Sequence, residues 1–213
     1  MNLKGIIFDL DGTLLDSMEL WSTIGEKYLK LKGYKANKDL QQTLKTMSLI
    51  QAAQYFRKTY GITDSEEMII KQIDELVEIG YYKEIPLKKG VLSLLNKLHN
   101  KDIKMCIATA TDKHLAEAAL KRLDILGYFC GVLTCSEVGF GKDRPEIFRK
   151  ALKLLNTDIN ETVIIEDNLH AIKTAKSAEF MVYGVHDKFS EKDSKQIRLV
   201  ADKYFITLED WEI

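Results

Sequence analysis

The chain has 213 residues, and its 31 basic and 32 acidic side chains give it a formal net charge of −1. Charges of both signs are interspersed, which argues against a nucleic-acid-binding stripe or a surface for anionic membranes. The length allows one domain with a full hydrophobic core, or a core with a smaller inserted domain. We therefore expect a small molecule as the partner, with no nucleic acid and no membrane.

The three cysteines, Cys106, Cys130 and Cys135, form an odd set without paired metal-ligand spacing. This usage is typical of reduced thiols in the cytosol and gives little support to a zinc site. The amino terminus has no apolar stretch of signal-peptide length, and no run approaches the length of a membrane span. We expect a cytoplasmic protein that is a monomer or a weak dimer.

The first predicted element is a short strand over residues 5–8, and it ends at two acidic residues, Asp9 and Asp11. An apolar, β-forming run of this kind is typical of a strand buried on both faces. Side chains at its carboxyl end face the ligand crevice of an α/β sheet. Two carboxylates there repel each other and bind cations, although an isolated Asp-x-Asp often makes only a loop before a helix. Other positions must decide between these readings.

Helical patterns fill the region from residue 16 to residue 83, with no strand signal between them. The predicted helices lie at about 17–32, 40–46, 49–60 and 65–82. We interpret this region as an all-helical insertion that would lie over the two aspartates as a lid. The predicted domains are an α/β core of residues 1–15 and 84–213, and a helical domain of residues 16–83.

Helix and strand patterns alternate after Pro86 and Gly90. A helical stripe from Val91 to Leu98 leads into a strand from Ile103 to Ala108. Further helices are predicted near 113–123, 145–155 and 169–178, and further strands at 131–133, 163–165, 180–183 and 204–206. Repeated βα units of this kind imply an α/β fold with a doubly wound, parallel, Rossmann-like sheet.

Three more polar signals fall at predicted strand ends or helix starts. Thr109 follows the second strand, Lys142 lies in a glycine-containing loop before a helix, and Glu166 with Asp167 closes a later strand. A hydroxyl followed by backbone amides can hold a phosphate, an ammonium can reach the same anion, and paired carboxylates suit Mg²⁺. Each signal alone has an ordinary explanation as a cap or a solvated side chain. Their common position at one sheet edge favours a single site.

Taken together, the four signals resemble the four motifs of the haloacid dehalogenase-like hydrolase superfamily. The matching stretches are DLDGTLLDS at Asp9 to Ser17, Thr109 after its strand, GKDRPEIF at Gly141 to Phe148, and IIEDN at Ile164 to Asn168. The helical insertion resembles the cap of the phosphoglycolate phosphatase and β-phosphoglucomutase-like branch. Dehalogenases of the superfamily lack the second aspartate, so Asp11 argues for phosphoryl transfer.

This resemblance implies a Mg²⁺-dependent phosphatase that hydrolyses a small phosphomonoester metabolite through an aspartyl-phosphate. Asp9 would be the nucleophile, Asp11 the general acid and base, and Thr109 and Lys142 would bind the transferring oxygens. The implied Mg²⁺ ligands are Asp9, the Asp11 carbonyl, Asp167, and Glu166 directly or through water. We also expect Lys142 to hold Asp9 ionised, because a neighbouring cation lowers a carboxyl pKa.

Specificity in such enzymes resides in the cap. The candidate substrate contacts are Ser17, Trp21 and Lys45 in the insertion and Ala110 in the core. Trp21 can equally belong to the core of the helical insertion, and a lysine such as Lys45 is often only solvated surface. These positions do not identify the phosphomonoester.

A β-phosphoglucomutase-like sugar phosphomutase is the alternative enzyme. However, Trp21 and Leu49 stand near the positions where that type carries a cap histidine and a cap arginine. The third motif also departs from the family's Lys-Pro-x-Pro-Asp, because residues 142–146 read Lys-Asp-Arg-Pro-Glu. A receiver domain of the response-regulator type would lack both the helical insertion and Asp11. A non-catalytic binding module would have no need of the intact acids and lysine.

Overall fold

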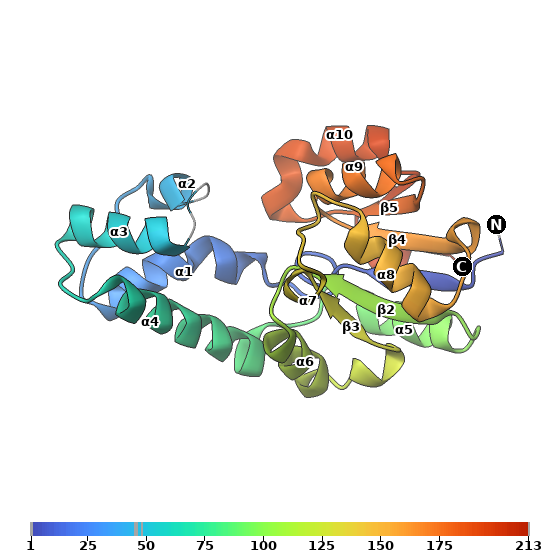
Figure 1. The fold of residues 1–213 in the computed structure, drawn as a ribbon, viewed down its shortest axis with the longest axis horizontal. Helices are drawn as coiled ribbons and strands as arrows, with labels where there is room; N and C mark the ends of the chain where they lie inside the picture. Colours follow the sequence, from blue (N-terminus) through green and yellow to red (C-terminus); the bar gives the residue numbers. More distant parts are fainter. Residues whose placement is uncertain (1, 45–46, 48, 213) are drawn as a thin grey trace. The chain divides into compact units, whose positions relative to one another are not determined.

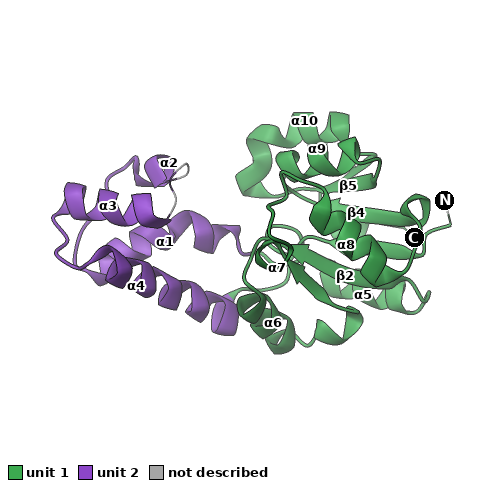
Figure 2. Cartoon of the chain, viewed as in Figure 1, with its two compact units in different colours: residues 1–16, 85–213 green, residues 17–84 purple. Residues whose placement is uncertain are grey.

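The computed structural model describes residues 2–44, 47 and 49–212. The chain divides into two compact units, shown in Figure 2. Residues 1–16 and 85–213 form one unit, here named the α/β unit, and residues 17–84 form the other, here named the helical unit. Each boundary lies one residue beyond the position that the sequence pattern predicts.

The α/β unit contains a parallel sheet whose six described strands run in the order β3-β2-β1-β4-β5-β6 (Figure 1). The strands are β1 (Gly5–Phe8), β2 (Lys104–Thr109), β3 (Val132–Thr134), β4 (Thr162–Glu166), β5 (Met181–Val185) and β6 (Lys203–Phe205). The chain moves outward from β1 through β2 to β3 and then crosses to the other side of β1 for β4. The strand order thus reverses beside β1, where open α/β sheets bind their ligands. The predicted doubly wound parallel sheet is confirmed.

Helices cover the sheet and bury its central strands. Side chains such as Ile7 and Ile164 pack in one apolar cluster with residues of α8 (Glu146–Leu155), α9 (Leu169–Ser177) and α10 (Ser194–Val200). Figure 1 shows α8 in front of the sheet and α5 (Val91–His99) behind it. Full burial of one such aliphatic side chain contributes about 1.5–3 kcal/mol. The apolar runs of the sequence are therefore explained by burial on both faces.

The remaining elements of the α/β unit are short connections and α6 (Lys113–Arg122), which packs beside β3. The shortest α-helix, α7, comprises only Cys135–Val138 and is fixed by a capping box between Thr134 and Glu137. The described residues of the unit also contain four 3₁₀ helices: η2 (Leu126–Tyr128), η3 (Ile159–Glu161), η4 (Lys188–Asp193) and η5 (Leu208–Asp210). The sequence pattern misses α7 and these turns because elements of three to six residues have no measurable periodicity.

The helical unit consists of α1 (Met18–Leu31), α2 (Leu40–Leu44), α3 (Leu49–Tyr60), α4 (Glu66–Ile79) and a π-helical turn, η1 (Gly80–Glu84). Its described residues contain no strand, as the pattern predicts. Tyr28 of α1 packs on Phe56 of α3, and Ile69 and Ile73 of α4 are buried. Ser65 begins α4 by accepting a hydrogen bond from the backbone N–H of Met68.

The state of the cysteines and the length of the helices can be compared with what the composition predicts. All three cysteines are free. In the part of the chain that the structure describes, the helices are too short or too polar to cross a membrane.

Candidate active site

The carboxyl ends of β1 and β4 bring three acidic side chains together. Phe8 pairs with Ile165 in the parallel register, and the backbone N–H of Asp9 donates to the Ile165 carbonyl at 2.9 Å. Asp9 therefore stands level with Glu166, and Asp167 follows directly. One carboxylate oxygen from each of these three buried residues lies within 4.8 Å of the other two. Asp9 of the first motif and the two acids of the fourth motif thus share one small volume.

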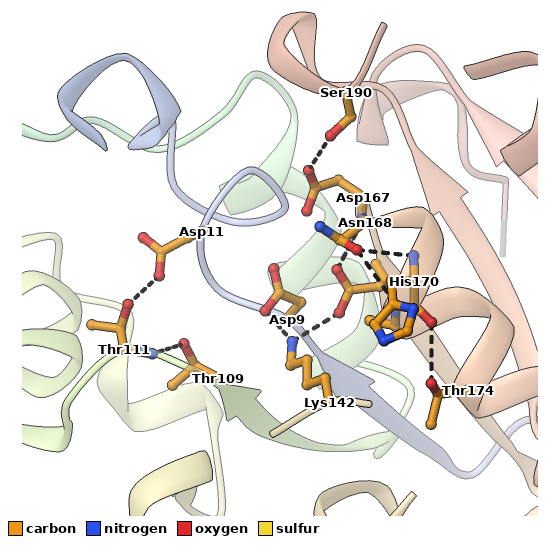
Figure 3. Close-up of polar contacts among 12 residues, drawn as sticks. Asp9, Asp11, Thr109, Thr111, Lys142, Asp167, Asn168, His170, Thr174 and Ser190 are labelled. Carbon is orange, nitrogen blue, oxygen red and sulfur yellow. Dashed lines mark hydrogen bonds and ion pairs between the residues drawn. The ribbon is translucent and has the colours of Figure 1, made fainter. Parts of the chain in front are cut away.

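Lys142 enters this volume from the loop before α8. Its Nζ donates to Asp9 Oδ1 (Figure 3). It also donates to Glu166 Oε2 at 2.8 Å, so the ammonium is shared by the two carboxylates. Only 12% of the lysine side chain is exposed. Burial alone would lower the Lys142 pKa, but the charges of Asp9 and Glu166 outweigh it and raise the pKa above its ordinary value. Lys142 is therefore a permanent cation.

One ammonium does not offset three buried acids. The pKa of Asp9 is raised to about 7, first by burial and then by the charge of Glu166, although Lys142 acts in the opposite direction. The pKa of Asp167 is also raised, by burial and by the charges of Glu166 and Asp9. The expectation that Lys142 holds Asp9 ionised is therefore wrong for the metal-free protein, because desolvation and Glu166 outweigh the lysine.

The residues present fit a hard divalent cation. The donors are all carboxylate oxygens, which Mg²⁺ prefers, and a cation would relieve the excess negative charge. The two oxygens of Glu166 already have partners, since Oε2 accepts from Lys142 and Oε1 accepts from the N–H groups of Asp167 and Asn168 at 3.1 and 3.0 Å. This arrangement favours Asp9 and Asp167 as direct ligands. Glu166 would then either only orient Lys142 or contact the metal ion through a water molecule.

Gly12 lets the turn after β1 approach this cluster closely. Its φ of +81° lies in the left-handed region, and a Cβ atom there would be 2.7 Å from Asp167 Oδ2. Both the conformation and the space require glycine. The glycine of the first motif thus has a packing role beside Asp167 that its position in the sequence does not reveal.

The Asp11 carboxylate does not belong to the cluster of three acids found among the described residues. Its Oδ2 accepts a hydrogen bond from Thr111 Oγ1 at 2.6 Å, and the Thr111 N–H in turn donates to Thr109 Oγ1 at 3.0 Å. Figure 3 shows the Asp11 carboxylate extending toward Thr111. Thr109 is buried at the end of β2, as the sequence predicts. The Thr111 side chain was not among the candidates from the sequence, where its only signal is a second hydroxyl two residues past the strand end.

The contacts of two other side chains near the acids were also not predicted. Ser190 Oγ donates to Asp167 Oδ2 at 3.1 Å, and Asn168 begins α9 by accepting from the backbone N–H of His170 at 2.9 Å. Ser190 belongs to η4, in a highly charged stretch that carries no motif. Its contact depends entirely on the fold.

The candidate substrate residues have different environments. Ala110 is exposed in the bend after β2. Ser17 is fully buried, and its hydroxyl has no hydrogen-bond partner among the described residues. Trp21 is 38% exposed, and its Nε1 donates to Tyr81 Oη at 3.0 Å within the helical unit. Lys45 lies outside the described residues.

The fold and the site define a class of protein: an α/β enzyme with a lysine-bridged carboxylate cluster at the switch point of a parallel sheet. The sequence profile of the haloacid dehalogenase-like hydrolases matches residues 6–185, and the chain belongs to this family.

Individual relatives span most of the chain. A phosphorylated carbohydrates phosphatase from Thermotoga maritima is 28% identical over 86% of this chain and 85% of its own length. A β-phosphoglucomutase from Bacillus subtilis is 27% identical over 86% of this chain and 83% of its own length. A crystal structure of a T. maritima protein, 26% identical, superimposes with a TM-score of 0.84 and covers 98% of this chain and 96% of that protein. Proteins named as a phosphatase and as a phosphoglucomutase are thus both similar to this chain.

Proposed function

We propose that the chain is a Mg²⁺-dependent phosphatase that hydrolyses a small phosphomonoester through an aspartyl-phosphate on Asp9. The observation that carries this proposal is the Lys142 ammonium held between Asp9 and Glu166, with Asp167 beside them. A phosphate dianion can approach Asp9 only where positive charge offsets the repulsion between the two anions. Lys142 supplies part of that charge and lies directly against the proposed nucleophile.

Asp9 and Asp167 would hold the metal ion. A bound Mg²⁺ would supply further neutralisation of the phosphate oxygens. Lys142 and Thr109 would bind the same oxygens from the protein side, and Lys142 would remain ion-paired with Glu166 throughout. Asp9 would thereby be left to react as an ionised carboxylate.

The proposed reaction has two steps. Asp9 attacks phosphorus, the bond to the leaving oxygen breaks, and Asp11 gives that oxygen its proton. Asp11 then takes a proton from water as the water oxygen attacks phosphorus, which releases inorganic phosphate and regenerates Asp9. In this structure the Asp11 carboxylate is hydrogen-bonded to Thr111, so proton transfer requires it to turn toward the bound phosphate.

Mg²⁺ binding is expected to weaken about ten-fold when the pH falls from 8 to 6, because protons compete for Asp9. With a pKa of about 7, this carboxyl group is mostly ionised at pH 8 and mostly protonated at pH 6. Isothermal titration calorimetry at both pH values, in buffers of different ionisation enthalpy, measures the affinity and the protons released. Equal affinities at the two pH values, without proton release, would contradict the assignment of Asp9 as a ligand.

We propose the helical unit as the cap that selects the substrate, with Ser17 and Trp21 as candidate contacts and Ala110 as a contact from the core. The free cysteines support a reducing compartment such as the cytoplasm. The B. subtilis relative supports a sugar phosphomutase as a second candidate function. Trp21 and Leu49 stand near the positions where that type carries a cap histidine and a cap arginine, and the absence of those two side chains favours hydrolysis.

Phosphate release from a panel of phosphorylated sugars, glycerol phosphates and phosphoglycolate is expected to require Mg²⁺. Excess EDTA should reduce turnover to background, and added Mg²⁺ should restore it, because the buried acids repel phosphate without a cation. A parallel assay of hexose 1-phosphate isomerisation, with and without a hexose bisphosphate activator, tests the mutase. Turnover that is insensitive to EDTA would contradict the metal dependence, whereas activator-dependent isomerisation faster than phosphate release would favour the mutase.

A further inference from the structure

Lys88 binds the turn that carries the two catalytic aspartates. Its backbone N–H donates to the Leu14 carbonyl at 2.9 Å, and its Nζ donates to the Gly12 carbonyl at 2.6 Å. A further antiparallel bridge joins Leu15 to Leu87. The segment that begins at residue 85 thus holds the turn by backbone contacts and by the Lys88 side chain.

The Lys88 ammonium also binds the segment that follows β5. Nζ donates to the His186 carbonyl at 2.7 Å and to Asp187 Oδ2 at 2.9 Å. An ammonium has three protons, and here the Gly12 carbonyl and these two oxygens provide three acceptors. Lys88 and Asp187 side chains are 16% and 2% exposed, so their ion pair is far less screened than a surface pair. Lys88 therefore connects the turn at Gly12 to the segment at His186 and Asp187, which lies far from that turn in the sequence.

Asp187 extends this connection to the metal-binding cluster. Its second oxygen, Oδ1, accepts from the backbone N–H of Phe189 at 2.9 Å and so fixes the start of η4. The next residue of η4, Ser190, donates to Asp167 Oδ2 at 3.1 Å (Figure 3). The segment 186–190 is thereby held by Lys88 at one end and contacts Asp167 at the other.

We propose that Lys88 is a positioning residue that fixes the Asp167 carboxylate for cation binding by anchoring the segment 186–190. The inference rests on the proposed function, since it assigns Lys88 to the same metal site. Gly12 strengthens the argument, because the turn whose carbonyl Lys88 binds is also packed against Asp167. Residues that orient a ligand in this way typically change metal affinity or activity by 10–100-fold when they are removed.

A single Lys88→Met change would combine two opposing effects. Loss of the Lys88 contacts should weaken Mg²⁺ binding because Asp167 becomes less well fixed. Loss of the positive charge should strengthen Mg²⁺ binding because the Asp187 carboxylate is left without its cation. The double variant Lys88→Met with Asp187→Asn separates them, because it removes one positive and one negative charge and keeps the net charge. It breaks the ion pair without leaving a buried charge alone.

The double variant is expected to bind Mg²⁺ about ten-fold more weakly than the parent in calorimetric titrations of the metal-free protein. At saturating Mg²⁺ its kcat should fall by a similar factor, while KM for the phosphomonoester stays within about two-fold, since Lys88 does not contact substrate in this proposal. Circular dichroism and thermal melting verify that the variant is folded at the assay temperature.

Lys89 and Glu209 provide a matched control. Their side chains form an ion pair at 2.9 Å, but they are 77% and 45% exposed. The charge-neutral pair of changes Lys89→Met and Glu209→Gln should leave Mg²⁺ affinity and kcat unchanged. Equal effects in the control and in the Lys88 double variant would show a general consequence of altered charge and would overturn the proposal.

Ser190→Ala is a milder change that tests the contact between the segment 186–190 and Asp167. It provides the test of the proposal if the double variant does not fold. We expect Mg²⁺ affinity to fall about five-fold, because Asp167 loses a donor that orients it. Unchanged Mg²⁺ affinity in Ser190→Ala, or in a folded double variant, would overturn the proposal while leaving the phosphatase assignment intact. A parent protein that neither binds Mg²⁺ nor depends on it would instead refute the proposed function.

Discussion

Replacing Asp9 with asparagine is expected to lower kcat by about 10⁵-fold or more, because the amide cannot form the covalent intermediate. Asparagine has nearly the same shape, and Glu166 still pairs with Lys142. The lysine should therefore remain in place and the substrate should still bind. Phosphate release at saturating substrate and Mg²⁺ measures the effect, and retention of more than about 1% of the activity would show that another group is the nucleophile.

The same variant should be more stable than the parent when metal is absent, and increasingly so as the pH rises from 4 to 7. The Asp9 pKa is about 7 in the folded protein against an ordinary value of 3.8. The folded state therefore holds this proton more tightly than the unfolded state, and ionisation of Asp9 progressively costs folding free energy between these two values. Asparagine does not ionise. A difference in Tm between variant and parent that is independent of pH, measured in EDTA, would contradict the raised pKa.

The location of the site could be predicted from sequence because it depends on strand ends. Asp9, Thr109 and Glu166 each follow a short apolar run, and parallel strands bring their carboxyl ends to one edge. Lys142 could be included because the resemblance supplied a role for a lysine in that loop. These inferences need only that the strands run parallel in one sheet, which follows from repeated βα units.

The balance of charge and the supporting contacts could not be predicted in the same way. The raised pKa of Asp9 depends on burial and on its spacing from Glu166, and a sequence specifies neither. Lys88 and Ser190 are ordinary lysine and serine residues in segments without a motif. Their contacts, with Gly12 and Asp167, join positions far apart in the chain. Such side chains become recognisable only when three-dimensional neighbours are known.

Replacing Asp11 with asparagine is expected to lower steady-state turnover by about 10³–10⁴-fold, because proton transfer is lost in both steps. The amide oxygen can still accept the Thr111 hydrogen bond, so the turn should keep its conformation. The two steps should nevertheless differ with an activated substrate. A nitrophenolate leaving group needs little protonation, so Asp9 should still be phosphorylated by 4-nitrophenyl phosphate, whereas attack by water on the aspartyl-phosphate should stay slow.

Stopped-flow absorbance of Asp11→Asn with 4-nitrophenyl phosphate should therefore show a burst of about one nitrophenolate per active site, followed by slow release. Intact-mass spectrometry of the same sample should detect the phosphorylated protein, and Asp9→Asn should give neither signal. Asp16→Asn is a suitable control, because this exposed acid follows the same turn and should keep parental kinetics.

A slow linear phase without a burst would mean that Asp11 is needed to form the intermediate even with a good leaving group. Parental turnover in Asp11→Asn would show that Asp11 is not the general acid and base, because loss of a group that transfers protons in both steps must slow turnover.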